Sequence, residues 1–260
     1  MTLNFNESCL FLLVLNMKSW SDFFQSSPSD NKGGFTSRLS FTSGTVYVFN
    51  SFFESLTNLA GNGGAIDFSS SSDSSILLVE ETTILNCICS QNGGGVFFSN
   101  KVNAVLHKIC AFNCSSTEGG GVFYYNYVSD SKIYKSEVNF STFSSVKSTR
   151  NYAIYLRYGT IQVSKTNESF INCRNHAGLR LGSSGSDGEL TGTVSYSTFY
   201  NNTATSSMCV FFAYCTARIQ NQMVSCNVIK NAQSTSANSN GIIEFNEATG
   251  IQSTSILQNS

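Results

Sequence analysis

The sequence predicts an all-β fold, a single-stranded parallel β-helix in which each repeat of roughly 24 to 33 residues forms one of about eight coils. Three observations predict it. A glycine pair followed by a short apolar strand recurs along the chain, and a second motif recurs in phase with it. No stretch shows the 3.6-residue periodicity of a helix. Repeats of this length that carry two or three short strands are typical of stacked β-coils.

The glycine motif is clearest at Gly63-Gly64-Ala65-Ile66 and recurs at Gly93-Gly94-Gly95-Val96. The second glycines of its four clear copies follow one another at nearly regular intervals, and they are Gly34, Gly64, Gly94 and Gly120. Glycine adopts positive φ without steric cost, so we expect these residues to form a sharp corner before the strand.

The second motif is a bulky residue followed three positions later, in most copies, by Cys, Asn or Ser. Its nine copies end at Ser26, Ser55, Cys87, Cys114, Phe143, Cys173, Asn202, Cys226 and Asn259. We expect these end positions to stack as one corner ladder, with Cys87, Cys114, Cys173, Asn202 and Cys226 as structural members.

Alternation within the glycine-led strand predicts which side chains face inward. Two inward rows are expected, one of Ile66, Val96, Val122, Ile154, Leu179 and Val210, the other of Phe68, Phe98, Tyr124, Leu156, Leu181 and Phe212. The outward row between them starts at Asp67 and contains the candidate ligand-binding residues Phe97, Phe123, Tyr155, Arg180 and Phe211. An aromatic stripe there could bind sugar rings or a partner protein, or its rings could simply stabilise the solenoid under a covering loop.

The repeats are expected to occupy residues 23 to 260. Residues 1 to 22 are interpreted as a partial first coil, in which the apolar run 10 to 15 is a strand; the alternative is the core of a signal peptide. That run is too short for a membrane span. Ile256 resembles the beginning of another corner motif, and no polar cap is recognisable at either end, so we expect the chain to be a fragment or truncated copy of a longer solenoid.

Charged residues make up only 12% of the chain and the net charge is -1, which argues against a nucleic-acid partner. Nine cysteines cannot all pair within one chain. Cys87 and Cys114 should stack on adjacent coils, where free packed thiols are favoured and a disulfide is the alternative.

Catalytic and metal sites are not predicted. No two of the six Asp residues occupy equivalent positions of adjacent coils, which leaves no carboxylate cluster for a pectin-cleaving lyase or hydrolase. His107, Cys110 and Cys114 have a spacing found in zinc sites, but no partner pair of cysteines completes it. We expect no enzyme activity and no cofactor; a polysaccharide lyase or glycoside hydrolase, and a truncated copy without its own function, are the alternatives.

The two motifs together resemble the polymorphic outer-membrane protein repeat of bacterial surface autotransporters and of large protist surface-protein families. Gly63-Gly64-Ala65-Ile66 and Phe199-Tyr200-Asn201-Asn202 match it fully, and Phe170-Ile171-Asn172-Cys173 matches with Cys in place of the last Asn. The resemblance implies a right-handed parallel β-helix at the cell surface or outside the cell, with a role in adhesion or antigenic variation and a host or cell-surface glycan or protein as partner.

Overall fold

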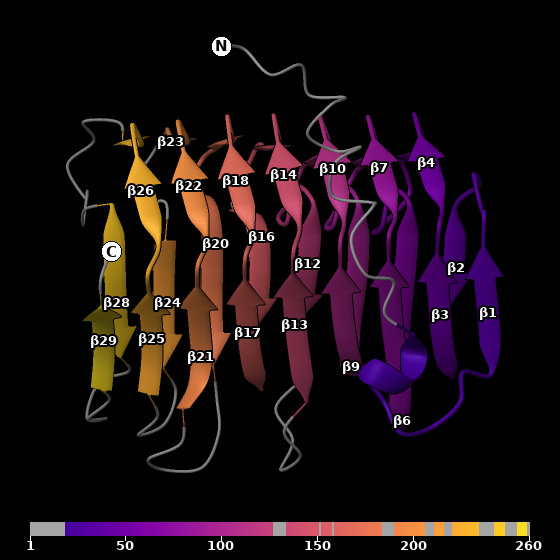
Figure 1. Ribbon diagram of the computed structural model, residues 1–260. Coiled ribbons are helices and arrows are strands. Elements are labelled where there is room, and N and C mark those ends of the chain that lie inside the picture. Colours follow the sequence, from indigo (N-terminus) through magenta and orange to yellow (C-terminus); the bar gives the residue numbers. More distant parts are fainter. Residues whose placement is uncertain are drawn as a thin grey trace.

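The computed structural model is a parallel β-solenoid whose strands stack coil upon coil (Figure 1). It describes residues 19–126, 134–150, 152–157, 159–183, 190–205, 211–215, 220–233, 242–247 and 254–258. Within these residues every strand pairing is parallel and the only helix is one short 3-10 turn. The predicted fold class is therefore confirmed.

Each complete coil passes through four faces, and faces 1 and 2 belong to one continuous sheet. In two coils a single strand runs through both faces, namely β6 (Ile66–Glu80) and β9 (Val96–His107). The remaining strands of face 1 are β2 (Leu39–Phe41), β12 (Phe123–Asn126), β16 (Tyr152–Arg157), β20 (His176–Ser183), β24 (Phe211–Cys215) and β28 (Ile243–Glu247). Those of face 2 are β1 (Asp30–Gly33), β3 (Thr45–Phe49), β13 (Lys135–Asn139), β17 (Thr160–Ser164), β21 (Leu190–Ser195), β25 (Gln220–Val224) and β29 (Thr254–Gln258).

Faces 3 and 4 are narrow sheets of seven described strands each, one fewer than the eight coils expected from the repeats. Face 3 contains β4 (Phe52–Glu54), β7 (Thr83–Leu85), β10 (Cys110–Phe112), β14 (Thr142–Ser144), β18 (Asn167–Ser169), β22 (Thr198–Tyr200) and β26 (Asn227–Ile229). Face 4 contains β5 (Thr57–Asn58), β8 (Ile88–Cys89), β11 (Ser115–Ser116), β15 (Lys147–Ser148), β19 (Asn172–Cys173), β23 (Thr203–Ala204) and β27 (Ala232–Gln233).

The core runs along the axis of the solenoid and consists of stacked apolar side chains. On face 1 one inward row contains Ile66, Val96, Phe123, Ile154 and Leu179, each at most 1% exposed. On face 2 another contains Val48, Val79, Leu106, Val138, Val163, Val194 and Met223. Each such side chain contributes about 1.5 to 3 kcal/mol on burial, so the stack offsets the entropy of ordering each coil.

The predicted register of face 1 is wrong by one residue in two coils. Val96 pairs with Phe123, not with Val122, and Leu179 pairs with Phe211, not with Val210. For the first of these coils the cause lies in the glycine corner, where positive φ occurs at the first glycine of one run, Gly93, and at the second glycine of the next, Gly120. Consequently Tyr125 and Ala213 take the register positions expected for Tyr124 and Phe212.

The glycines of this corner have two different roles. Gly63, Gly93 and Gly120 adopt positive φ, as expected for Gly120. Gly64 and Gly94 do not; they allow adjacent coils to approach closely, because a Cβ on Gly64 would overlap the carbonyl oxygen of Gly94. Gly34 has positive φ but follows β1 on face 2, so it belongs to a different position of the coil.

Two further corners flank face 3, and both use residues other than glycine in the left-handed conformation. The first-corner residues, between faces 2 and 3, are Asn50, Glu81, Lys108, Phe140, Lys165, Tyr196 and Ser225. The second-corner residues, between faces 3 and 4, each lie five positions later and are Ser55, Asn86, Asn113, Ser145, Phe170, Asn201 and Lys230. Bulky residues rarely adopt this conformation. Here hydrogen bonds between coils enforce it: the Phe140 and Tyr196 amides donate to Ser164 and Val224 in the next coil.

The expected single ladder of Cys and Asn residues is in fact three ladders. Cys87, Cys114 and Asn202 each follow a second-corner residue and share one row. Cys173 lies on face 4 and pairs with Ser148 and Ala204, whereas Cys226 follows the first-corner residue Ser225. Five buried thiols are free, and Cys87 and Cys114, for which free packed thiols are expected from the sequence, are among them.

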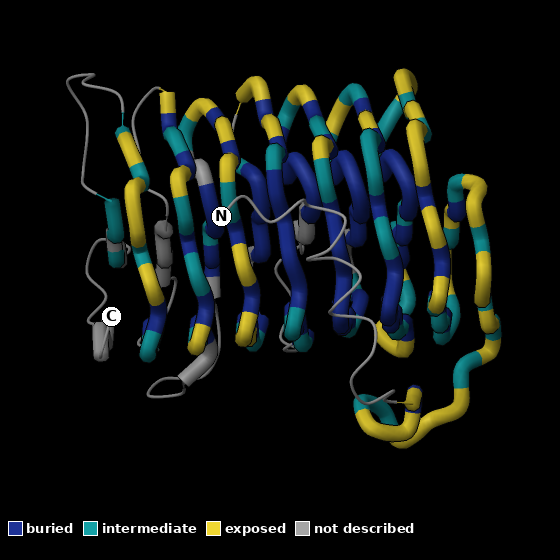
Figure 2. The backbone as a smooth tube through the Cα atoms, turned by 45° about the horizontal axis from the view of Figure 1, so that its top comes forward, coloured by how far each residue is buried: buried dark blue, intermediate teal, exposed yellow. Residues whose placement is uncertain are grey.

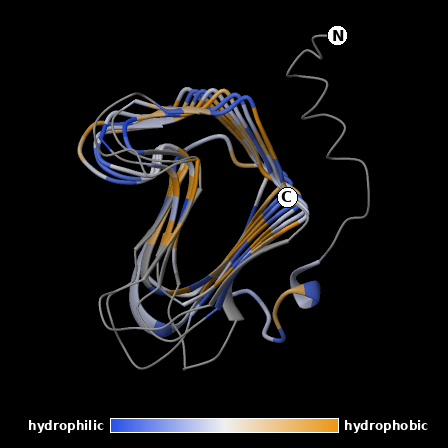
Figure 3. Cartoon of the chain, turned by 90° about the vertical axis from the view of Figure 1, so that its left-hand side faces the viewer, coloured by the Kyte–Doolittle hydropathy of each residue, from blue (hydrophilic) through white to orange (hydrophobic). Residues whose placement is uncertain are grey.

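Residues 19 to 24 form no part of the solenoid wall. Phe23 to Ser26 is therefore not a corner motif, contrary to the expectation from the sequence. The 3-10 helix η1 (Trp20–Asp22) lies outside the closed outline of the coils (Figure 3). Trp20 packs with Leu78 and Val105, which face outward from face 2, and its ring lies 5.9 Å from that of Tyr47. The expected strand at residues 10 to 15 lies outside the described residues.

Residues 19 to 24 form an N-terminal strap over face 2. The strap explains why the outward side chains of face 2 change from apolar to polar along the solenoid. The outward row is apolar under the strap, at Leu78 and Val105, and polar in the next coils, at Glu137 and Gln162. Trp20 is the only tryptophan, so its fluorescence reports whether the strap is docked.

Replacing Leu78 with Asn is expected to detach the strap, because an amide under the indole removes about 2 to 3 kcal/mol of apolar burial. We expect a red-shifted Trp20 emission with an unchanged β-type circular dichroism spectrum. The control is Gln162→Asn, in the same outward row beyond the strap, which should leave the emission unchanged. An unshifted spectrum for Leu78→Asn would contradict the docking of Trp20.

Candidate functional site

The predicted ligand-binding stripe on face 1 is largely covered. Phe97 and Tyr155 occupy the outward register positions but are only 6% and 5% exposed. The expectation that Phe123 faces outward is wrong, since it pairs with Val96 and Ile154 and is fully buried in the core. Phe211 pairs with Leu179, the inward position, and its side chain lies outside the described residues. The structure therefore shows no continuous exposed aromatic stripe along the described part of this face.

Arg180, the fourth stripe residue, is held by two tyrosines. Its guanidinium carbon lies 4.6 Å from the centroid of the Tyr152 ring and 5.1 Å from that of Tyr155. The two rings stack at 4.9 Å, and Arg180 also donates a hydrogen bond to the Tyr152 hydroxyl. These contacts engage the cation within the protein, so this cluster stabilises face 1.

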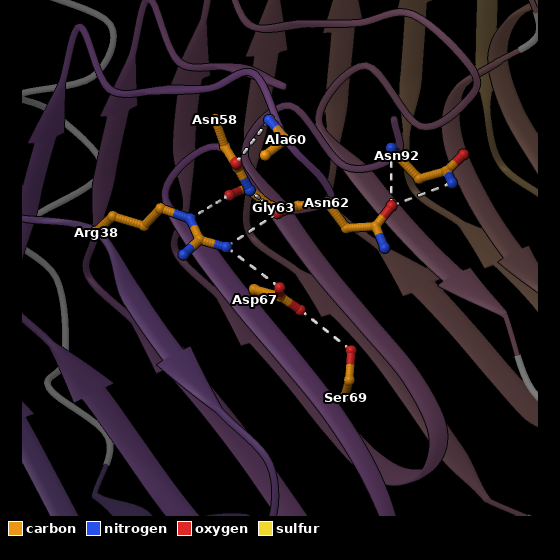
Figure 4. A network of polar contacts seen from close by, with 8 residues as sticks. All are labelled: Arg38, Asn58, Ala60, Asn62, Gly63, Asp67, Ser69 and Asn92. Atoms are coloured by element: carbon orange, nitrogen blue, oxygen red, sulfur yellow. Dashed lines mark hydrogen bonds and ion pairs between the residues drawn. The ribbon is translucent and has the colours of Figure 1, made fainter. Parts of the chain in front are cut away.

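Asp67, at the start of the outward row, is also engaged (Figure 4). Arg38 donates to the carbonyl oxygens of Gly63 and Asn62, at 2.8 and 3.0 Å, and forms a 3.2 Å ion pair with Asp67. Burial raises the pKa of the Asp67 carboxyl, while the Ser69 hydroxyl and Arg38 oppose that shift. The network joins Arg38 to the glycine corner at Gly63 and therefore has a structural role.

Exposed aromatic side chains gather instead on the two corners beside face 3. Phe170 and Tyr196 are 53% and 63% exposed, among the most exposed large side chains described. Figure 2 shows that exposed positions recur where these corners turn. We define the corner surface by its four rings and two cations, Phe140, Lys165, Phe170, Tyr196, Tyr200 and Lys230.

The corner surface is built from contacts between adjacent coils. The Lys165 ammonium lies 4.5 Å from the centroid of the Phe140 ring along the first corner. Phe170 and Tyr200 meet edge to face at 5.7 Å, and the Lys230 ammonium lies 5.6 Å from the Tyr200 ring. Lys165 and Lys230 are themselves exposed and form no ion pair among the described residues. Phe170, Tyr196 and both ammonium groups are thus exposed to solvent, with the half-buried rings of Phe140 and Tyr200 beside them.

Short polar side chains occupy the strip between the two corners. Asn167 and Asn227 are exposed and Thr198 is half-buried, all at the first position of their face 3 strands. Amide and hydroxyl groups can donate and accept hydrogen bonds. The strip therefore combines flat apolar rings, hydrogen-bonding groups and positive charge.

The other candidate site is not assembled. His107 lies on face 2, where the rings of Phe23 and Phe140 lie 5.1 and 5.3 Å away, while Cys110 is disulfide-bonded and Cys114 is a free thiol in the core. The three residues do not converge. Across the part of the chain that the structure describes, no group of three or more His, Cys, Asp or Glu side chains is placed to hold a metal ion.

Sequence reasoning missed the corner surface because its members belong to different motifs. Phe140, Phe170 and Phe199 all fit the bulky position of one motif in the sequence, yet Phe170 is an exposed corner residue and Phe199 is buried. The pattern that identifies the surface is the separation of the two corners by five positions, for example from Lys165 to Phe170.

Comparison with protein-family models, with curated proteins and with solved structures finds no match for this chain. No helix within the described ranges is long and apolar enough to cross a membrane. The class of the protein is therefore defined by its own architecture, a parallel β-solenoid with an aromatic and basic corner surface.

Proposed function

We propose that this chain is a non-enzymatic β-solenoid of the cell surface or extracellular space that functions in adhesion by binding a ligand on its lateral surface. The observation that carries the proposal is the corner surface, where Phe170 and Tyr196 are more than half exposed. Exposed aromatic side chains are costly in solution and common at binding sites.

Two further observations support an extracellular role. Cys110 is disulfide-bonded, and disulfides persist mainly in oxidising compartments outside the cytosol. The glycine and Phe-x-x-Asn motifs resemble those of surface-displayed β-helix repeats, whose role is adhesion. The rigid stack of coils fits this role because it holds the binding groups in a fixed array.

The test is binding of the labelled chain to cultured cells, measured by flow cytometry. The variant Phe170→Ser/Tyr196→Ser is expected to lose at least about tenfold in cell binding, because each ring provides stacking area that serine lacks. The control is Phe52→Ser, which removes a ring that is 43% exposed on the same face at the other end of the solenoid. Both variants should retain the wild-type circular dichroism spectrum.

Full binding by the double variant would overturn the assignment of the corner surface. Release of reducing or unsaturated ends when the chain is incubated with pectic polysaccharides, with or without calcium, would overturn the non-enzymatic role.

A further inference from the structure

The charge of the chain is distributed unevenly along the solenoid. Residues 139–233, which include the whole corner surface, contain eight Lys and Arg against three Asp and Glu, whereas the rest contains seven against thirteen. A chain with a net charge of -1 thus has one strongly basic part. Local charge of one sign attracts ligands of the other sign.

Among the described residues of this basic part, no acidic group neutralises the corner surface. Of its described residues only Glu168 is acidic, and that side chain points into the core and is 1% exposed. By contrast, Lys147, Lys165, Arg174 and Lys230 are exposed on faces 3 and 4 and their corners. Exposed cations without local counter-charges favour an anionic ligand.

The arrangement of rings and cations indicates what kind of anion fits. Phe140 and Tyr196 lie two coils apart on the first corner, which corresponds to about 9.6 Å along the solenoid at a strand spacing of about 4.8 Å. Lys165 lies between them in the ladder. Along the second corner the order is two rings followed by a cation, from Phe170 through Tyr200, which precedes Asn201, to Lys230. A linear ligand that carries both ring faces and negative groups would match the rings and cations of the corner surface.

The geometry points to an acidic polysaccharide, bearing carboxylate or sulfate groups, as the ligand of the corner surface. Its sugar rings stack on Phe170 and Tyr196, its negative groups meet Lys165 and Lys230, and its hydroxyls bond to Asn167 and Asn227 on the strip between. This inference rests on the proposed adhesive function and adds the chemical class of the ligand. The polar strip favours a hydroxyl-rich chain over a single-stranded nucleic acid, whose backbone needs a denser line of cations.

The test compares four immobilised probes, a sulfated glycosaminoglycan, polygalacturonate, neutral dextran and single-stranded DNA. We expect the chain to bind the two acidic polysaccharides, with an affinity that falls as salt is raised, and to bind dextran and DNA at least about tenfold more weakly. Lys165→Ser/Lys230→Ser should lose at least about tenfold in affinity, and Phe170→Ser/Tyr196→Ser should lose a similar factor at any salt concentration.

The matched control is Lys32→Ser/Lys101→Ser, which removes the same net charge from lysines paired with Asp30 and Asp73 elsewhere on the solenoid. Equal losses in the two lysine variants, tighter binding to DNA, or undiminished binding by the aromatic variant would each overturn the inference.

The failure of this inference can be distinguished from failure of the proposed function. If the corner variants lose cell binding but no acidic polysaccharide binds or competes, the ligand class is wrong and the adhesive surface stands. If acidic polysaccharides bind as expected but cell binding does not depend on the corner residues, the adhesive function is wrong.

Discussion

Replacing Glu168 with Met is expected to stabilise the solenoid at neutral pH by about 3 kcal/mol or more. Glu168 occupies the inward row of face 3, between Phe143 and Phe199, where the other described coils have apolar side chains. The side chain is fully buried and neither carboxyl oxygen has a hydrogen-bond partner. Burial of a carboxyl group without hydrogen-bond partners costs free energy. Met fills a similar volume and does not carry this cost.

The effect should depend on pH in a defined direction. Burial raises the pKa of Glu168 from 4.5 to about 8. Between these values the unfolded chain is ionised and the folded chain is neutral, so stability falls as pH rises through this window, by about 1.4 kcal/mol per unit and about 5 kcal/mol in total. Below pH 4.5 and above pH 8 both states have the same charge, and the contribution of Glu168 is constant.

Among the described residues, the titratable groups that face Glu168 do not interfere in this window. They are the thiols of Cys173 and Cys226, and burial raises the pKa of both. Urea unfolding at pH 4.5, 6, 7 and 8 should therefore show that the stability of the wild type falls as pH rises. Glu168→Met should lack the part of this fall that the titration of Glu168 causes. Glu168→Gln is the control: it also removes the titration but keeps a buried polar group. An unchanged pH dependence in both variants would show that Glu168 is not buried as described.

The variant Gly94→Ala is expected to prevent the two coils around the glycine corner from stacking. An added Cβ would overlap the carbonyl oxygens of Gly121 and Ser115, which belong to the next coil. The clash is with backbone, and backbone positions here are set by hydrogen bonds between coils, such as that from the Gly94 amide to Gly120. We expect the free energy of unfolding to fall by more than about 4 kcal/mol, a loss that single substitutions cause only through defects such as a severe steric clash.

The matched control is Gly61→Ala, which lies just before the glycine corner of the neighbouring coil. A Cβ there would approach only the Asn58 amide nitrogen, at 3.6 Å, which is ordinary contact. Its stability in urea should lie within about 0.5 kcal/mol of the wild type. Equal stability of Gly94→Ala and Gly61→Ala would contradict the close approach of the coils.

The fold class could be predicted from the sequence because both motifs repeat and the strands alternate. Ile66, Val96, Ile154 and Leu179 do share an inward row. The first of the two register errors arose where three glycines occur in succession, at Gly93 to Gly95 and Gly119 to Gly121, because the sequence does not indicate which glycine takes positive φ. One residue of error then moves a whole row to the other side of the sheet.

The candidate site could not be located by the same reasoning. The left-handed corners are set by hydrogen bonds between coils, which tolerate Phe, Tyr, Lys, Glu, Asn and Ser alike. No residue type therefore marks a corner, and exposed Phe170 cannot be distinguished by its letter from buried Phe199. The strap at Trp20 was missed for a related reason, since an apolar segment can cover a face of the solenoid as well as extend it.

The constant separation of the two corners has a consequence for how this molecule can diversify. Each first-corner residue precedes its second-corner residue by five positions, whereas the return to the next coil varies in length, being short from Ser145 to Lys165 and longer from Asn113 to Phe140. Insertions and deletions are thus absorbed on the far side of each coil. The two rows of outward side chains form a fixed grid, and new recognition properties can arise there by exchange of single side chains while the backbone stays unchanged.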